Sequence, residues 1–278
     1  MLVSWPYRER DTFYQRLDPR SRILFSFLGM LSLTLFQVWD LRILAIYGAA
    51  GGIQLRLSRV TLRESRTLWS ILLFVAASLT LLTLVTGKGG GDSIVDSHLL
   101  WQSPWLTLSV ERLTFAVSQF VRIGIVVLLF APLPYTLHPA RYGLVFHKFG
   151  VGDKFAVATD LAFRFVPNLA QDFETTMEAQ KARGYELDRA GGLWRALRNL
   201  APLLVPVTIG TILKGEDVID ALDLRAFGSG PRTWYRELHF RAVDWIVSIV
   251  AVGQFVTLGL AVGLNTDVGR LWVPPWFL

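Results

Sequence analysis

Five apolar runs recur along the chain, and each can form a helix that crosses a lipid bilayer. They are Ile23–Val38, Ile43–Leu57, Leu68–Val85, Leu113–Leu133 and Ala242–Leu264. The first two are short, because at 1.5 Å per residue each covers roughly 22 to 24 Å of a hydrocarbon layer about 30 Å thick. The pattern predicts an all-α, polytopic helical membrane protein with about five transmembrane helices and a polar helical region before the last one.

Basic residues along the chain orient these helices. The segment before the first span holds five Lys and Arg residues, the loop Arg56–Arg66 holds four, and the stretch Pro134–Arg241 holds fourteen. The other short loops hold only Arg42, Lys88 and Arg112. Because basic loops stay on the cytoplasmic side, we expect a multi-pass protein of the cell (inner or plasma) membrane with a cytoplasmic N-terminus and its C-terminus outside.

The same pattern divides the chain into five parts. They are a cytoplasmic N-terminal segment (1–22), a four-span region (23–133), a cytoplasmic or interfacial coupling-helix region (134–241), a final transmembrane helix (242–264) and an extracytoplasmic tail (265–278). In the final helix, Gly259 and Gly263 form a GxxxG pattern, which lets another helix approach closely.

The region between the fourth and fifth spans is helical and amphipathic. Leucine and phenylalanine alternate every four residues from Leu161 to Phe173, which predicts a helix over Asp160–Tyr185 that Pro167 either kinks or divides into two. A further apolar run, Leu200–Leu213, contains two prolines and is too short to span comfortably. We expect this run to form a short interfacial or internally packed helix.

Composition argues against several classes of function. The chain has no cysteine, and its four histidines lack ligand spacing, so we expect no metal site and no cofactor. The fourteen basic residues of Pro134–Arg241 are nearly balanced by twelve acidic ones, which favours a protein partner over nucleic acid. A membrane enzyme is a rival class, but the sequence holds no phosphate-binding loop, nucleophile elbow or zinc-protease motif. We therefore do not expect ATP hydrolysis in this chain.

Two segments of the polar region match each other. Glu178–Tyr185 and Asp220–Phe227 each contain an acid, an alanine, three further residues, an arginine, a tiny residue and an aromatic ring, in that order. A chance match between common residues is the alternative explanation. In the charged region of a membrane protein, the repeat predicts two matched helix ends that present arginine to a two-lobed soluble partner.

Both segments carry side chains suited to recognition. A guanidinium pairs with a carboxylate through two hydrogen bonds, small neighbours let it enter a groove, and an adjacent ring supplies an apolar anchor. The alternative is that Arg183 and Arg225 contact lipid headgroups or cap helix C-termini. The candidate docking residues are Ala182, Arg183, Gly184, Tyr185, Leu224, Arg225, Ala226 and Phe227.

Arg122 lies inside the fourth predicted span. An arginine within a membrane is costly, which often marks a functional site. Arg122 therefore supports an alternative function, a stand-alone secondary transporter or permease with its own substrate site near this residue. The competing interpretation is that Arg122 pairs with a structural partner or reaches the edge of the membrane.

Several of these motifs resemble those of one family. Ala182–Gly184, Leu224–Ala226, Gly228–Thr233 and Leu17–Arg22 are similar to segments of the transmembrane T component of energy-coupling factor (ECF) transporters, the EcfT and CbiQ type. The order of the spans is similar too, so the resemblance covers nearly the whole chain. One departure is Ala226, which stands where the family usually has glycine.

The resemblance implies a function. Such a protein is the coupling subunit of an ABC-class importer for a vitamin or a transition-metal ion, and it is not itself an enzyme. It holds a separate substrate-binding membrane subunit, the S component, and its two coupling helices end at Arg183 and Arg225 and dock into two ABC-type ATPases, which form a homo- or heterodimer. Substrate recognition belongs to the S component, so cobalt, nickel, biotin, riboflavin and folate all stay open.

Overall fold

The computed structural model describes residues 7–61, 63–86, 88–89, 92–93, 99–102, 107–185, 193–230, 233–235 and 237–264. Contacts among them define two compact units. The first, here called the bundle, comprises Tyr7–Leu137 and the described residues from His239 onward; the second, the hairpin unit, comprises His138–Leu238. Gly90, Arg232 and the predicted tail from residue 265 lie outside the described residues.

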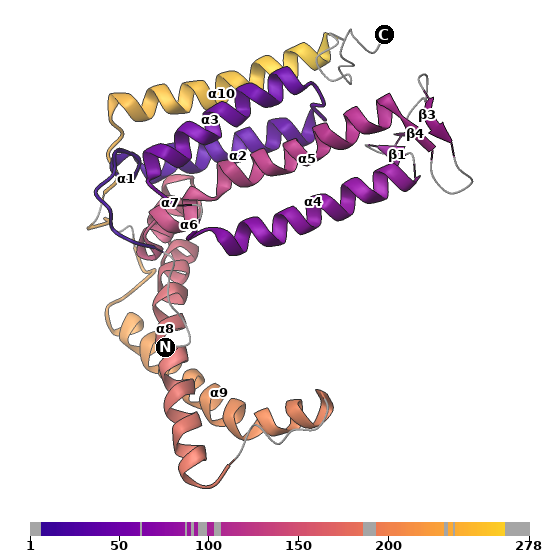
Figure 1. Cartoon of the computed structure of the whole chain (residues 1–278). Coiled ribbons are helices and arrows are strands. Elements are labelled where there is room, and N and C mark those ends of the chain that lie inside the picture. The colour runs from indigo at the N-terminus through magenta and orange to yellow at the C-terminus, as the bar shows by residue number, and fades with distance from the viewer. Residues whose placement is uncertain are drawn as a thin grey trace. The chain divides into compact units, whose positions relative to one another are not determined.

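Long helices form the bundle (Figure 1). They are α2 (Pro19–Leu35), α3 (Leu41–Ser58), α4 (Arg66–Thr86), α5 (Val110–Phe130) and α10 (Ala242–Gly263). Helix α5 contacts α2, α3 and α4, and α10 packs along α2. Each of the five helices overlaps one of the predicted spans.

Three stretches of the described residues are long and apolar enough to cross a membrane. They are α4, Val110–Thr136 and α10. The two remaining helices of the bundle, α2 and α3, are only 17 and 18 residues long, as the short apolar runs predict. The protein is therefore an all-α membrane protein.

Short elements complete the two units. They are α1 (Phe13–Arg16), β1 (Lys88–Gly89), β2 (Asp92–Ser93), β3 (Leu99–Gln102), β4 (Thr107–Ser109), α6 (Pro132–Thr136), a 3-10 turn η1 (Pro139–Arg141) and α7 (Tyr142–Lys148). The strands pair as two small antiparallel hairpins, β1 with β2 and β3 with β4, in the connection between α4 and α5.

Polar side chains fasten helices inside the bundle. Gln54 on α3 is 5% exposed, and its Nε2, which carries two hydrogens, lies within hydrogen-bonding distance of the Tyr14 hydroxyl at 2.6 Å, the Ser26 hydroxyl at 3.0 Å and the Leu129 carbonyl at 3.1 Å. Lipid offers no competing water, so such hydrogen bonds help to hold transmembrane helices together. One amide thereby links α1, α2, α3 and α5.

The Leu17–Arg22 motif joins the first and last helices of the bundle. Asp18 caps α2 by accepting from the Arg20 backbone N–H at 2.9 Å. Asp244 on α10 is fully buried and accepts from the Asp18 backbone N–H at 2.7 Å, the Ser21 hydroxyl at 3.0 Å and the Arg241 backbone N–H at 2.9 Å. This carboxylate therefore serves the N-termini of both helices, where the helix dipoles favour negative charge.

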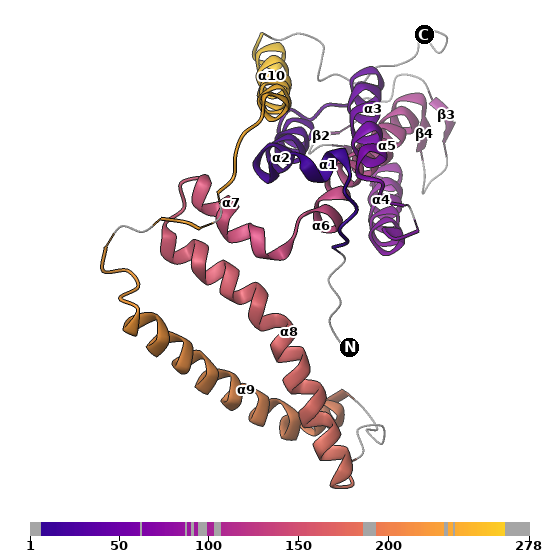
Figure 2. The same ribbon diagram turned by 90° about the vertical axis from the view of Figure 1, so that its left-hand side faces the viewer.

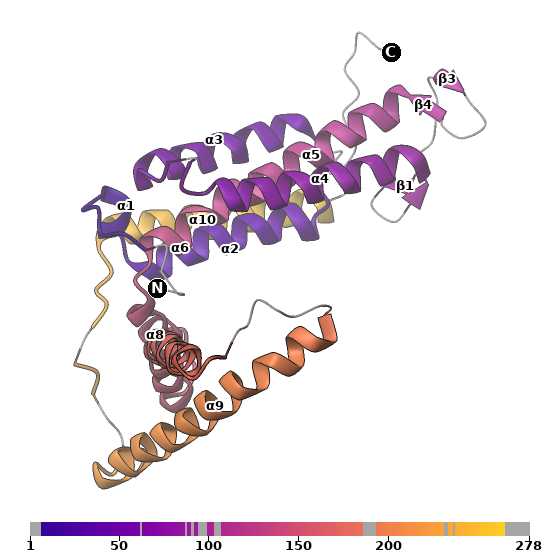
Figure 3. The ribbon, with the colours of Figure 1, turned by 60° about the horizontal axis from the view of Figure 1, so that its bottom comes forward.

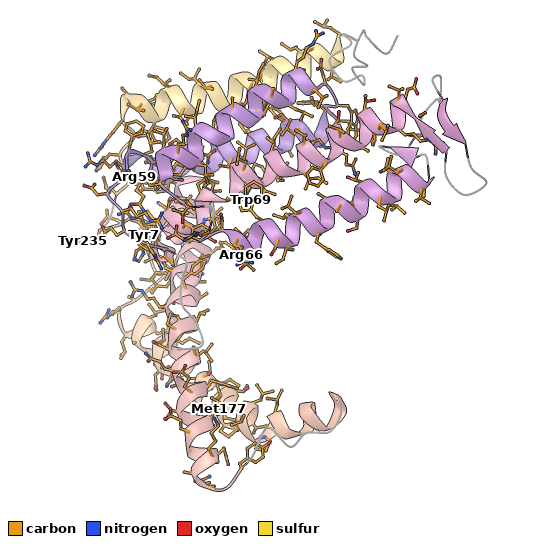
Figure 4. The ribbon with its side chains drawn as sticks, viewed as in Figure 1. Tyr7, Arg59, Arg66, Trp69, Met177 and Tyr235 are labelled. Atoms are coloured by element: carbon orange, nitrogen blue, oxygen red, sulfur yellow. The ribbon has the colours of Figure 1, made fainter. Side chains whose placement is uncertain are left out.

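An ion-pair cluster holds the N-terminal segment to the turn between α3 and α4. Arg8 and Arg10 both pair with Glu64, and Tyr7, Arg59 and Arg66 lie at this same end of the bundle (Figure 4). The hydrogen bond from Arg10 lowers the pKa of the Glu64 carboxyl to about 2. The carboxylate therefore stays charged throughout the physiological pH range.

The hairpin unit is dominated by two long antiparallel helices, α8 (Asp153–Ala182) and α9 (Leu193–Leu224), which Figures 2 and 3 show crossing each other. Lys214 on α9 pairs with Asp172 on α8 at 2.7 Å. Nearer the connection between the helices, Gln180 Nε2 donates to the Pro202 carbonyl at 3.5 Å. Pro206 cannot supply the usual helical N–H to that carbonyl, so the side chain of Gln180 takes its place.

The structure corrects one sequence expectation and decides between two alternatives that the sequence left open. The helix expected at Leu200–Leu213 is part of α9, which has 32 residues and continues through Pro202 and Pro206. The apolar run marks only the part of α9 that lacks charge, and the proline positions do not end the helix. Pro167 likewise lies inside a continuous α8, which excludes a junction between two separate helices at that residue.

Candidate partner-docking site

The first repeat is the C-terminal end of α8. Helix α8 ends at Ala182 with Arg183 as its C-cap, and Gly184 then adopts a left-handed conformation with φ of 82°. The Gly184 backbone N–H donates to the Lys181 carbonyl at 3.0 Å, and the Tyr185 N–H donates back to the Gln180 carbonyl at 3.0 Å. This pair of bonds is a Schellman motif, which satisfies carbonyls that the end of a helix leaves without partners.

The second repeat ends α9 in the same way. Ala226 adopts a left-handed conformation with φ of 52°. Its N–H donates to the Asp223 carbonyl at 2.8 Å, and the Phe227 N–H donates to the Leu222 carbonyl at 2.9 Å. Gly184 and Ala226 thus correspond, as do Tyr185 and Phe227, so the sequence repeat is also a repeat of backbone structure.

This geometry explains the tiny residue that follows each arginine. A Cβ built on Gly184 meets no atom of the described residues within 4 Å, so crowding among those residues does not require glycine there. The positive φ does favour it, because an L-residue in the left-handed region costs roughly 1 to 2 kcal/mol. Ala226 bears that strain, which gives the departure from glycine a definite physical cost.

The side chains of each end are accessible at the surface of the hairpin unit. Ala182, Arg183, Gly184, Leu224, Arg225 and Ala226 are exposed, and Leu224 is 89% exposed. Tyr185 and Phe227 are half-buried at the base of each turn. Each end therefore presents a cation beside an aromatic ring on a fixed backbone, a combination common in binding hot spots.

The two ends lie at opposite ends of the hairpin unit. Lys154, in the first turn of α8, lies beside Gly228, just after the second repeat. The first repeat follows at the other end of α8, about 40 Å farther along at 1.5 Å per residue. This separation suits two binding surfaces on a large or two-lobed partner.

A cleft of about 430 Å³ runs between α8 and α9 next to the second end. Its lining includes Arg164 and Arg225, the carboxylates Asp160 and Asp217, and apolar side chains such as Leu161. The mixed charge of this lining agrees with the balanced charge of the whole region and favours a protein partner over a polyanion.

Arg122 belongs to α5 of the bundle, whereas both repeats belong to the hairpin unit. Its guanidinium carbon lies 3.9 Å from the centre of the Trp39 ring, and Trp39 is 7% exposed and packs on Phe115 with ring centres 4.1 Å apart. A cation over an indole is a stabilising contact. This geometry favours the structural interpretation of Arg122 over a substrate site.

Two contacts in the bundle involve residues whose partners the sequence did not identify. Asp244 gave a readable signal, since it is an acid inside a predicted span, but its partners could not be known from one sequence. Only the first glycine of the GxxxG pattern is in close contact with another helix. A Cβ on Gly259 would approach the Phe36 ring to 3.0 Å, whereas one on Gly263 meets no atom within 4 Å in the part of the chain that the structure describes. Gly259 therefore permits close packing of α10 on the end of α2.

The described residues hold no group of three His, Asp or Glu side chains that could bind a metal ion. The fold and these two ends define an all-α, multi-pass membrane protein with a polar helical hairpin that carries two matched arginine caps. The chain belongs to the CbiQ family, described as "Cobalt transport protein", whose model matches residues 10–235.

The chain is similar to several proteins named "Energy-coupling factor transporter transmembrane protein EcfT". It is 27% identical to that of Heliobacterium modesticaldum over 271 residues, which cover 91% of this chain and 95% of the relative. It is 27% identical to that of Lactococcus lactis subsp. cremoris over 263 residues, covering 90% and 94%. It is 28% identical to that of Thermanaerovibrio acidaminovorans over 271 residues, covering 92% and 96%. The similarity thus extends over both units.

Proposed function

We propose that this protein is the membrane coupling subunit of an ECF-type importer. It links ATP hydrolysis by two partner ABC-type ATPases to a separate substrate-binding membrane subunit, and it performs no catalysis itself. The names of its relatives support the class of transporter. The single observation that supports the coupling role best is the repeated arginine cap at the two ends of the hairpin unit.

The two ATPases dock at the two caps. Arg183 and Arg225 each pair with a carboxylate in a groove of one ATPase, while Tyr185 and Phe227 pack against its apolar rim. The hairpin unit lies in the cytoplasm, as its thirteen basic residues predict. The imported substrate is a micronutrient, a vitamin or transition-metal ion, whose identity is set by the substrate-binding subunit.

Purification tests this function against the alternative of a stand-alone secondary transporter. The tagged chain, expressed with the ABC ATPases and small membrane proteins of its own organism, should co-purify with two ATPase subunits and one substrate-binding subunit. Reconstituted alone in liposomes, it should move no substrate. Uptake by the chain alone, driven by an ion gradient and lost in Arg122→Ala, would instead support the secondary transporter.

A further inference from the structure

The segment after α9 folds over the first turn of α8. Gly228 turns the chain with φ of 87°, and the side chain of Lys154 lies 3.4 Å from the position of a Cβ on this glycine. A cavity of about 480 Å³ lies beneath the segment, and Phe227 and Trp234 both line it. The aromatic ring of the second docking end therefore shares a cavity with a tryptophan seven residues later.

Trp234 is held by two residues at the junction of α7 and α8. Its indole Nε1 donates to Asp153 Oδ1 at 3.2 Å, and its ring stacks on His147 with ring centres 4.9 Å apart and an angle of 27° between the planes. His147 Nδ1 lies 2.7 Å from the same Asp153 oxygen. His147, Asp153 and Trp234 thus form a closed three-residue contact, here called the clamp.

His147 and Asp153 of the clamp belong to two helices that pack closely against each other. Asp153 is the first residue of α8, and His147 lies in the last turn of α7. Asp160 of α8 accepts from the Gly143 backbone N–H of α7 at 3.0 Å, and a Cβ on Gly143 would overlap the Ala156 carbonyl oxygen. Helices α7 and α8 are therefore in close contact, and the clamp holds Trp234 against the junction between them.

Holding Trp234 in place restricts a segment of the chain that contains two glycines. Gly228 and Gly230 lie between the second docking end and Trp234, and glycine gives a chain more conformational freedom than any other residue. Fixing Trp234 removes much of that freedom before any partner binds. A preorganised end binds more tightly, because less conformational entropy is lost on docking.

We propose that His147, Asp153 and Trp234 are positioning residues that hold the second docking end, Leu224–Phe227, in its partner-binding conformation. This inference rests on the proposed function, because the partner at that end is an ABC ATPase. The clamp is most of the length of α8 away from the first end, Arg183–Tyr185. Loss of the clamp therefore weakens one of the two ATPase contacts selectively and makes the transporter asymmetric.

Site-specific photo-cross-linking tests the proposal. The photoreactive amino acid p-benzoylphenylalanine replaces either Tyr185 or Phe227 in the full chain, expressed with the two ATPases of its organism, and the yield of cross-linked ATPase is measured. Trp234→Phe keeps a ring for stacking on His147 but loses the indole N–H. We expect it to lower the yield at position 227 about threefold or more and to leave the yield at 185 unchanged.

Three further variants test the result more closely. Asp153→Ala removes the acceptor, and combining it with Trp234→Phe should lower the yield at 227 no more than the stronger single change, because both remove the same contact. Trp245→Phe, on α10 of the bundle, is the matched control and should change neither yield.

Different cross-linking results would contradict the role of the clamp and the docking function. If Trp234→Phe leaves the cross-linking yields at positions 185 and 227 unchanged, the role of the clamp is overturned. The same holds if it lowers both yields equally. An absence of ATPase cross-links at both positions in the otherwise native chain contradicts the docking function itself. Membrane-inserted amounts of each variant, measured in the same samples, exclude loss of the protein as the cause of a lower yield.

Discussion

Gly184 and Ala226 occupy the same left-handed position in two copies of one helix cap. The sequence shows that both residues are small, but only the backbone angles show why. Glycine adopts a positive φ without strain, whereas alanine pays a steric cost of its Cβ against the backbone. The two proposed docking ends therefore have the same backbone hydrogen bonds and different intrinsic stabilities.

Exchanging these residues tests this explanation at the residue scale. Gly184→Ala should destabilise the first cap by about 1 kcal/mol, while Ala226→Gly should stabilise the second by a smaller amount because glycine also gains freedom in the unfolded chain. Hydrogen exchange of the Tyr185 and Phe227 amides, which close the two caps, measures both changes. Exchange should speed up at Tyr185 and slow down at Phe227. Faster exchange at Phe227 in Ala226→Gly would show that φ does not limit this cap.

At the scale of elements, α9 combines an apolar proline-containing half with a charged half that ends in the second docking cap. Proline removes a backbone N–H from the helical ladder at Pro202 and Pro206, which leaves a place where the helix bends easily. Gln180 bonds the carbonyl that Pro206 leaves without its helical donor. This hydrogen bond therefore joins α8 to the proline-containing half of α9.

Replacing both prolines tests the importance of that bend. In Pro202→Ala/Pro206→Ala the ladder is complete and α9 stiffens, so we expect ATP-driven uptake to fall while ATPase binding is retained. Pro167→Ala, in α8, serves as a matched control for a proline in the other helix. Uptake equal to that of the native transporter in the double variant would exclude a hinge at these prolines.

The elements that could be predicted from the sequence are those whose structure depends on neighbouring residues in the chain. The five apolar runs predicted the bundle helices because a helix that crosses lipid needs a continuous stretch of apolar residues. The length of α9 was missed because its charged half has no continuous apolar run, and its contacts with α8, such as Lys214 with Asp172, join residues distant in sequence. The caps were found as a repeat of residue types, but their left-handed positions and the Trp234 clamp depend on backbone angles and tertiary contacts.

For the whole molecule, charge predicts which parts face the cytoplasm. The chain has no native cysteine, so single cysteines report topology without background. Cysteines at Arg63 and Lys181 should be protected from a membrane-impermeant reagent in intact cells, and those at Gly90 and Leu278 should react. The protected positions should become reactive once the membrane is opened. Labelling of position 181 from outside would contradict the five-span topology.

The two arginines carry the central claim about the whole transporter. If each guanidinium meets a carboxylate in a desolvated groove, its removal leaves that carboxylate without a partner and should weaken the contact by about 2 to 5 kcal/mol. Lysine should restore little of this loss, because it lacks the planar fork that forms two parallel hydrogen bonds. The strained Ala226 cap predicts that the two contacts are unequal.

The most direct measurement is ATPase recovery with the tagged chain, together with ATP-driven uptake, for Arg183→Ala, Arg225→Ala, the double variant and the two lysine variants. Arg63→Ala, which changes an exposed arginine between α3 and α4 of the bundle, is the control. We expect each single alanine variant to lose part of the bound ATPase, and the double variant to lose assembly and transport while remaining inserted in the membrane. Full assembly and transport by an inserted double variant would contradict the account.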